Sequence, residues 1–92
     1  MSEDMKQVTL FTSEIIWLLN DIGIEVANAR RKHLPMNSLH ESYAVILEEV
    51  DELWDEVRAW QPGSDYDKAR KECIQIAAMA VRCILDVCDK QR

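Results

Sequence analysis

Apolar residues recur at helical spacing along most of the chain and predict three helices. The first is expected over about residues 8–32, with Thr9, Thr12 and Ser13 as candidate N-caps. Its apolar positions form one stripe on the helix surface: Phe11, Ile15, Leu18, Leu19, Ile22, Val26 and Ala29. Such a stripe is typical of a helix that packs with one face on a neighbour.

The second helix is expected over about residues 38–60. It opens with Ser38 and Glu41, which have the spacing of a capping box. Its apolar residues alternate between spacings of four and three: Leu39, Tyr43, Ile46, Val50, Leu53, Val57 and Trp60. A heptad seam of this kind is suited to helix-on-helix packing, so we expect it to face another helix.

The third helix is expected over about residues 64–89, after a Gln-Pro-Gly turn at residues 61–63. Ser64 is its candidate N-cap. From Cys73 to Cys88 the helix is apolar on nearly every side, which is typical of a helix surrounded by others. Two further helices cannot surround it, so part of its cover is expected from a second subunit.

The composition supports the same conclusion. The chain has 92 residues, of which 48 % are hydrophobic, a generous share for a domain too small to bury much of its surface. Apolar surface beyond what one small core can use predicts self-association. The predicted fold is therefore all-α, a single domain over residues 1–92. It is a helical bundle with a helix-turn-helix hairpin, completed by oligomerisation.

Charge and cysteine content exclude several classes of protein. Seventeen acidic residues against eleven basic ones give a formal charge of −6, which disfavours nucleic-acid binding. No stretch of about 18 uncharged apolar residues is present, so no membrane-spanning helix is expected. The three cysteines are an odd count without a C-x-x-C pair, which indicates neither a disulfide framework nor a zinc site. A reducing, cytoplasmic location is the simplest interpretation.

The second helix carries an unusual density of acid. Between residues 41 and 57 there is no Lys or Arg, but there are seven acids: Glu41, Glu48, Glu49, Asp51, Glu52, Asp55 and Glu56. Like charges at i,i+4 cost about 0.2–0.5 kcal/mol per pair, and a merely solvated face would normally mix signs. Two interpretations are open at this point, an acidic surface stripe or a site for a hard cation such as Mg²⁺ or Mn²⁺.

The turn brings further polar residues level with these acids. Counted from Pro62 along an antiparallel hairpin, Glu52 lies level with Glu72, and Glu49 lies level with Gln75. However, the acidic face of the second helix lies opposite its heptad seam. The acids would therefore meet the third helix around an edge, or they would face a second subunit.

These residues also carry a resemblance to a known family. Glu48-Glu49-Val50-Asp51-Glu52, followed by Glu72-Cys73-Ile74-Gln75, resembles the E-E-x-x-E … E-x-x-D signature of the MazG-like all-α nucleoside triphosphate pyrophosphohydrolases. The resemblance covers about half of the chain, from Leu39 to Asp86. It implies a dimeric or tetrameric helical bundle that uses Mg²⁺, with Mn²⁺ as a possible substitute. It also implies hydrolysis of an NTP or dNTP between the α- and β-phosphates.

The motif assigns roles to individual residues. By the resemblance, the metal ligands are Glu49, Glu52 and Glu72, with Gln75 at the fourth ligand position. Glu48 is a further ligand or the base that orients the attacking water, so Glu48 and Glu49 are the expected catalytic residues. The departure is Gln75, because the family pattern has Asp there, and its neutral side chain removes one negative charge from the site.

The groups that would hold a nucleotide are less well defined. Arg82, on the buried part of the third helix, is the best candidate for binding phosphate, and Lys71 is a second; Arg58 and Lys68 are further candidates. The tryptophans are expected in the core or at an interface: Trp17, Trp54 and Trp60. Two rival functions remain. One is a catalytically impaired relative that binds nucleotide or metal, and the other is an acidic helical module that binds a basic protein.

Overall fold

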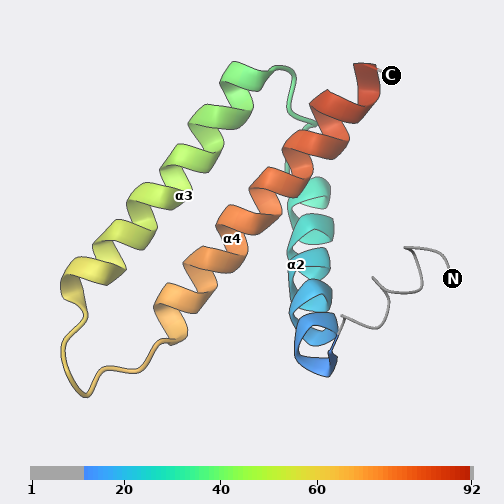
Figure 1. Ribbon diagram of the computed structural model, residues 1–92. Helices are drawn as coiled ribbons and strands as arrows, with labels where there is room; N and C mark the ends of the chain where they lie inside the picture. The colour runs from blue at the N-terminus through green and yellow to red at the C-terminus, as the bar shows by residue number, and fades with distance from the viewer. Residues whose placement is uncertain (1–11, 92) are drawn as a thin grey trace, which may run out of the picture.

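The computed structural model describes residues 12–91, which form an all-helical fold. Its three main helices are α2 (Ser13–Lys32), α3 (Leu39–Ala59) and α4 (Asp67–Cys83). After α4 the chain continues through a π-helical turn, η1 (Ile84–Cys88), and a 3-10 turn, η2 (Asp89–Gln91). Figure 1 shows α4 lying between the other two helices, with α3 and α4 as an antiparallel hairpin. Within the described part of the chain, no helix is both long and apolar enough to cross a membrane.

The first helix ends where the sequence predicted and begins with one of its candidate caps. The hydroxyl of Thr12 accepts a hydrogen bond from the Ile15 N–H at 3.4 Å, so Thr12 is the N-cap of α2. The helix ends at Lys32. The predicted start at residues 8–11 and the candidate cap Thr9 lie outside the described residues.

The second helix is capped as predicted, with one difference. The Ser38 hydroxyl accepts from the Glu41 N–H at 3.0 Å, which is the first half of the capping box. The Glu41 carboxylate, however, accepts from the N–H of Asn37 at 3.1 Å, one residue before the expected donor. The Glu41 side chain therefore also holds Asn37, in the connection between α2 and α3.

The predicted cap of the third helix is wrong. Ser64 belongs to the turn, where its N–H donates to the Gln61 carbonyl at 2.8 Å and its hydroxyl accepts from the Gln61 N–H at 3.2 Å. Pro62 and Gly63 occupy the central positions of this turn, and Gly63 has φ 98°, a conformation that glycine adopts without strain. Because the turn uses the Ser64 hydroxyl, the helix begins three residues later, at Asp67.

The core lies where α4 crosses the last turns of α2 and the connection that follows. Six apolar residues are buried there: Val26, Ala29, Met36, Ala78, Met79 and Val87. Three of the six belong to α4 and η1, which confirms that the apolar third helix is the central one. Ala78 is completely buried, and its small side chain suits a close contact between helices.

The heptad seam of α3 does not face α4 as a whole, which corrects the sequence prediction. Of its seven members only Ile46 and Leu53 are partly buried, and the other five are exposed: Leu39, Tyr43, Val50, Val57 and Trp60. The inward face of α3 instead carries Ser42, which is 1 % exposed, and the partly buried Val45 and Glu49. The Ser42 hydroxyl lies 3.2 Å from the Met36 sulfur and donates to the Ser38 carbonyl at 3.0 Å, so α3 packs on the connection that precedes it as well as on α4.

The tryptophans are not part of the core. Trp17 is 70 % exposed and Trp54 is 57 % exposed, and Trp60 stacks on Tyr66 at the hairpin tip with ring centroids 5.4 Å apart. The first half of α2 is likewise rich in exposed apolar side chains. The protomer therefore leaves two apolar surfaces uncovered, one on α2 and one on α3.

Candidate metal centre

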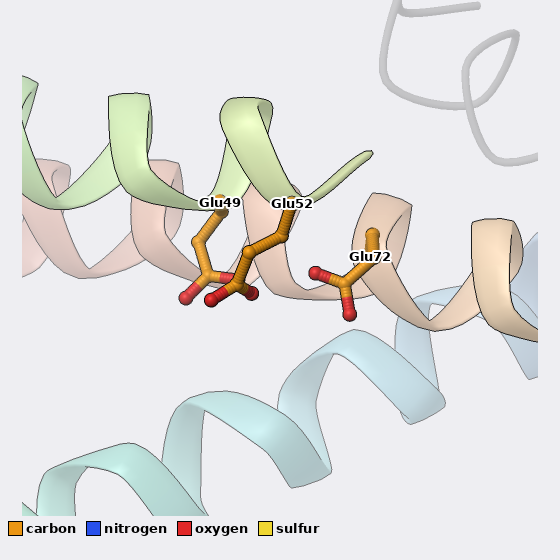
Figure 2. Close-up of side chains that lie close together, drawn as sticks. All are labelled: Glu49, Glu52 and Glu72. Carbon is orange, nitrogen blue, oxygen red and sulfur yellow. The ribbon is translucent and has the colours of Figure 1, made fainter. Parts of the chain in front are cut away.

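Three carboxylates converge where α3 lies against α4. Glu49 and Glu52 come from α3, and Glu72 comes from α4. One oxygen of each lies within 4.8 Å of the corresponding oxygens of the other two. Figure 2 shows the three side chains extending toward one another on the side of the hairpin where α2 passes. A single ion could contact all three groups.

The local sequence explains this convergence. Glu49 and Glu52 are three residues apart, so they share one face of α3. The hairpin turn places Glu52 level with Glu72, as counting from Pro62 predicted. The face of α3 that carries Ser42, Val45 and Glu49 is the one turned inward, so Glu49 and Glu52 meet Glu72 where α3 contacts α4.

The surroundings of the cluster disfavour its charged form. Burial raises the pKa of Glu49 to about 7, together with a hydrogen bond and charge from Glu52 and the charges of Glu72 and Glu48. Burial and the same contacts with Glu52 raise the pKa of Glu72, although the neighbouring charge of Lys71 opposes this. Two like charges 4 Å apart repel by about 4 kcal/mol near a protein surface. The cluster therefore needs either protons or a positive charge.

Two oxygens of the cluster have no partner. Glu49 Oε2 and Glu72 Oε2 are buried and accept no hydrogen bond, and within residues 12–91 no salt bridge reaches any of the three carboxylates. Buried polar atoms are normally satisfied, because an unmade hydrogen bond is costly. Carboxylate oxygens are the donors that Mg²⁺ and Mn²⁺ prefer. The residues present therefore fit a hard divalent cation.

A groove of about 480 Å³ adjoins the cluster and shares Glu49 with it. Its walls come from all three helices and from the connection between α2 and α3: Glu25, Ala29, Lys32, His33, Leu34, Met36, Glu41, Val45, Glu48, Glu49, Gln75, Met79 and Arg82. This volume lies within the range that small-molecule sites occupy, about 300–1,000 Å³. The lining combines apolar side chains with four acids, Glu25, Glu41, Glu48 and Glu49, and two cations, Lys32 and Arg82.

The remaining predicted site residues are distributed around this groove. Glu48 is exposed and lines it beside Glu49, and Gln75 is half-buried and lines it from α4. Lys71 is exposed and lines a separate groove between α2 and α4. Arg82 is 4 % exposed, and its Nη2 donates to the Leu34 carbonyl at 3.1 Å, so part of its hydrogen-bonding capacity is already used.

Sequence reasoning missed three residues of the groove. Glu25, Lys32 and His33 line it from α2 and the start of the connection. The available signal for Glu25 was its spacing from Ile22 and Ala29, which puts an acid on the packed face of α2. Glu25 and Gln75 line both grooves, so they face each other across the α2–α4 contact.

The raised pKa of Glu49 predicts a pH dependence of stability. A carboxyl with a folded-state pKa of about 7, above its unfolded value, contributes stability that is present at low pH and is lost as the pH rises through 7. In metal-free buffer we expect the free energy of unfolding to fall between about pH 5 and pH 8. Urea titrations should show a flatter profile for Glu49→Gln and an unchanged one for Glu14→Gln, on the exposed first turn of α2. A parental profile that rises with pH would contradict this account.

Comparison with known proteins assigns this chain to no family. We found no match of the chain to a family model, to a curated protein sequence or to a solved structure. The functional interpretation therefore depends on the chemistry of the residues themselves.

Proposed function

We propose that this protein is a Mg²⁺-dependent nucleotide pyrophosphohydrolase of the MazG-like type, which converts an NTP or dNTP to a nucleoside monophosphate and pyrophosphate. The observation that carries the proposal is the convergence of Glu49, Glu52 and Glu72 from two helices, with two buried oxygens that lack partners. These are three of the four ligand positions of the signature, and they lie beside a groove large enough for a nucleoside.

The proposed reaction transfers the nucleotidyl group, the nucleoside with its α-phosphate, to water. The oxygen of water attacks the α-phosphorus, the bond from this phosphorus to the oxygen bridging the β-phosphate breaks, and pyrophosphate leaves with the electron pair of that bond. A bound divalent cation would neutralise the phosphates and lower the pKa of the attacking water. Glu48, exposed on the groove beside Glu49, is the residue we assign to orient the water and accept its proton.

The rest of the substrate would lie in the groove. Lys32 and His33 line the groove and form no ion pair within residues 12–91, so we add them to Arg82 as candidates for contacting phosphate. Lys71 is a candidate only for phosphates that project beyond the cluster toward α2 and α4, since it lines the other groove. The base would pack on the apolar part of the lining, where Met36 and Met79 lie.

Gln75 favours a second candidate function, a relative that binds nucleotide without turning it over. A Gln can offer a carbonyl oxygen to Mg²⁺, but it removes one negative charge from the site. An acidic module for a basic protein partner is less well supported, because Glu49 and Glu56 are partly buried along α3 and do not form a simple solvated stripe.

A screen of NTPs and dNTPs with Mg²⁺ or Mn²⁺, with pyrophosphate release as the readout, tests the proposal. We expect metal-dependent release with at least one nucleotide. Glu72→Gln should lower the rate by at least about tenfold, since even outer-shell partners of metal ligands are worth 10–100-fold. Glu14→Gln is the matched control and should retain the parental rate. Nucleotide binding without pyrophosphate would favour the non-catalytic relative, and absence of binding would exclude both.

We also propose that the protein functions as a homo-oligomer, a dimer or a tetramer. Only six apolar side chains are buried in the described protomer, whereas α2 and α3 each expose a row of large ones. On α3 the exposed row includes most of the heptad seam: Leu39, Tyr43, Leu47, Val50, Trp54 and Val57. A second copy that packs on this row would remove apolar surface from water on both protomers.

Light scattering at micromolar concentration tests this assembly, and we expect at least a dimer. Val50→Glu places a charge in the middle of the exposed row and should shift the protein toward the monomer. Ala44→Glu introduces the same charge at an exposed position outside the row and should leave the assembly intact. A well-folded parental monomer, or equal dissociation of both variants, would contradict the assignment of this surface.

A further inference from the structure

A second buried carboxylate lies at the opposite end of α4 from the hairpin turn. The Asp86 side chain is 2 % exposed, and each of its oxygens has a partner. Oδ1 accepts from Arg30 Nη2 at 3.1 Å, and Oδ2 accepts from the Met36 N–H at 3.1 Å. Burial alone would raise the pKa of Asp86, but these two hydrogen bonds and the charges of Arg30 and Arg82 lower it, so the group stays ionised.

Asp86 also holds Arg82 in place. The Arg82 Nε lies 3.8 Å from Asp86 Oδ2, an ion pair without a hydrogen bond, and the side chain of Arg82 is 5 % exposed. A buried guanidinium needs a counter-charge, and Asp86 supplies it. Arg82 in turn donates to the Leu34 carbonyl at 3.1 Å. Asp86 therefore fixes the connection between α2 and α3 directly at Met36 and indirectly at Leu34.

Leu34 and Met36, the two residues held in this way, belong to the wall of the groove. Leu34 and Met36 line it on one side, and Glu48 and Glu49 line it from α3. The connection has no helix or strand of its own, so its distance from α3 depends on such side-chain bonds. Asp86 itself does not line the groove and does not belong to the carboxylate cluster. Its effect on a ligand is therefore separable from metal binding.

We propose that Asp86 is a positioning residue that sets the width of the nucleotide groove by holding Leu34 and Met36 against α4. This rests on the proposed function for the identity of the ligand, a nucleoside triphosphate. A neutral side chain of the same shape could still accept from the Met36 N–H. It would not hold Arg30 and Arg82 by charge, and the Leu34 side of the wall would be released.

The test measures nucleotide and metal binding separately on Asp86→Asn. The probes are the α,β-methylene analogues of ATP, CTP, GTP and UTP with Mg²⁺, and Mn²⁺ alone, each by isothermal titration. We expect the dissociation constant of the best analogue to rise about tenfold, because small displacements in a binding site are costly. The affinity for Mn²⁺ alone should stay within about twofold, because the cluster keeps all its ligands. Asp55→Asn, an exposed position paired with Arg58, is the matched control and should bind both probes as the parent does.

A second variant covers the case in which Asp86→Asn does not fold. Asp86→Glu keeps the negative charge but lengthens the side chain by one methylene, which displaces the contacts with Arg30 and the Met36 N–H, and it should also weaken binding of the analogue. If either folded variant binds the analogue as tightly as the parent does, the positioning role is overturned and the proposed function is not. Loss of Mn²⁺ affinity in parallel would also overturn the positioning role, since Asp86 would then act on the whole fold. A parent that binds Mn²⁺ but no analogue would overturn the proposed function, and the positioning role with it.

Discussion

The repulsion among Glu49, Glu52 and Glu72 is the constraint on which the rest of the site depends. The α3–α4 contact brings an oxygen from each within 4.8 Å of the others, and although Glu52 is exposed, the burial of Glu49 Oε2 and Glu72 Oε2 limits the help that water can give. Protonation relieves this repulsion, as the pKa of about 7 at Glu49 indicates, and a divalent cation would relieve it too. The two compete for the same oxygens, so a bound cation should expel protons near neutral pH.

A comparison of the cluster with Asp86, which lies in η1 beyond the end of α4, supports a functional role for the cluster. Asp86 is also buried, but every one of its oxygens has a partner, and its pKa is lowered. That is how a structural carboxylate is stabilised. Glu49 and Glu72 are left with buried, unpartnered oxygens and raised pKa values. Perturbed groups beside a groove are typical of functional sites.

The sequence predicted the helices, the hairpin and the position of Glu52 opposite Glu72 along it, because these follow from local spacing and turn chemistry. It did not predict which face of α3 meets α4. The heptad seam was the stronger pattern, but the buried face of α3 carries Ser42, whose contact with Met36 in the connection follows from no local spacing. The groove residues His33 and Lys32 were equally out of reach, since their role depends on how the connection is held by α4, a contact between residues almost fifty positions apart.

The most direct test of the central claim is the number of protons released when Mn²⁺ binds. Isothermal titration of the metal-free protein at pH 7, repeated in buffers of different ionisation enthalpy, measures binding and proton release together. We predict saturable binding of Mn²⁺ with release of protons from the cluster, and loss of both in Glu52→Gln but not in Glu14→Gln. Absence of saturable binding, or binding that Glu52→Gln leaves unchanged, would contradict the claim that these three carboxylates share a cation.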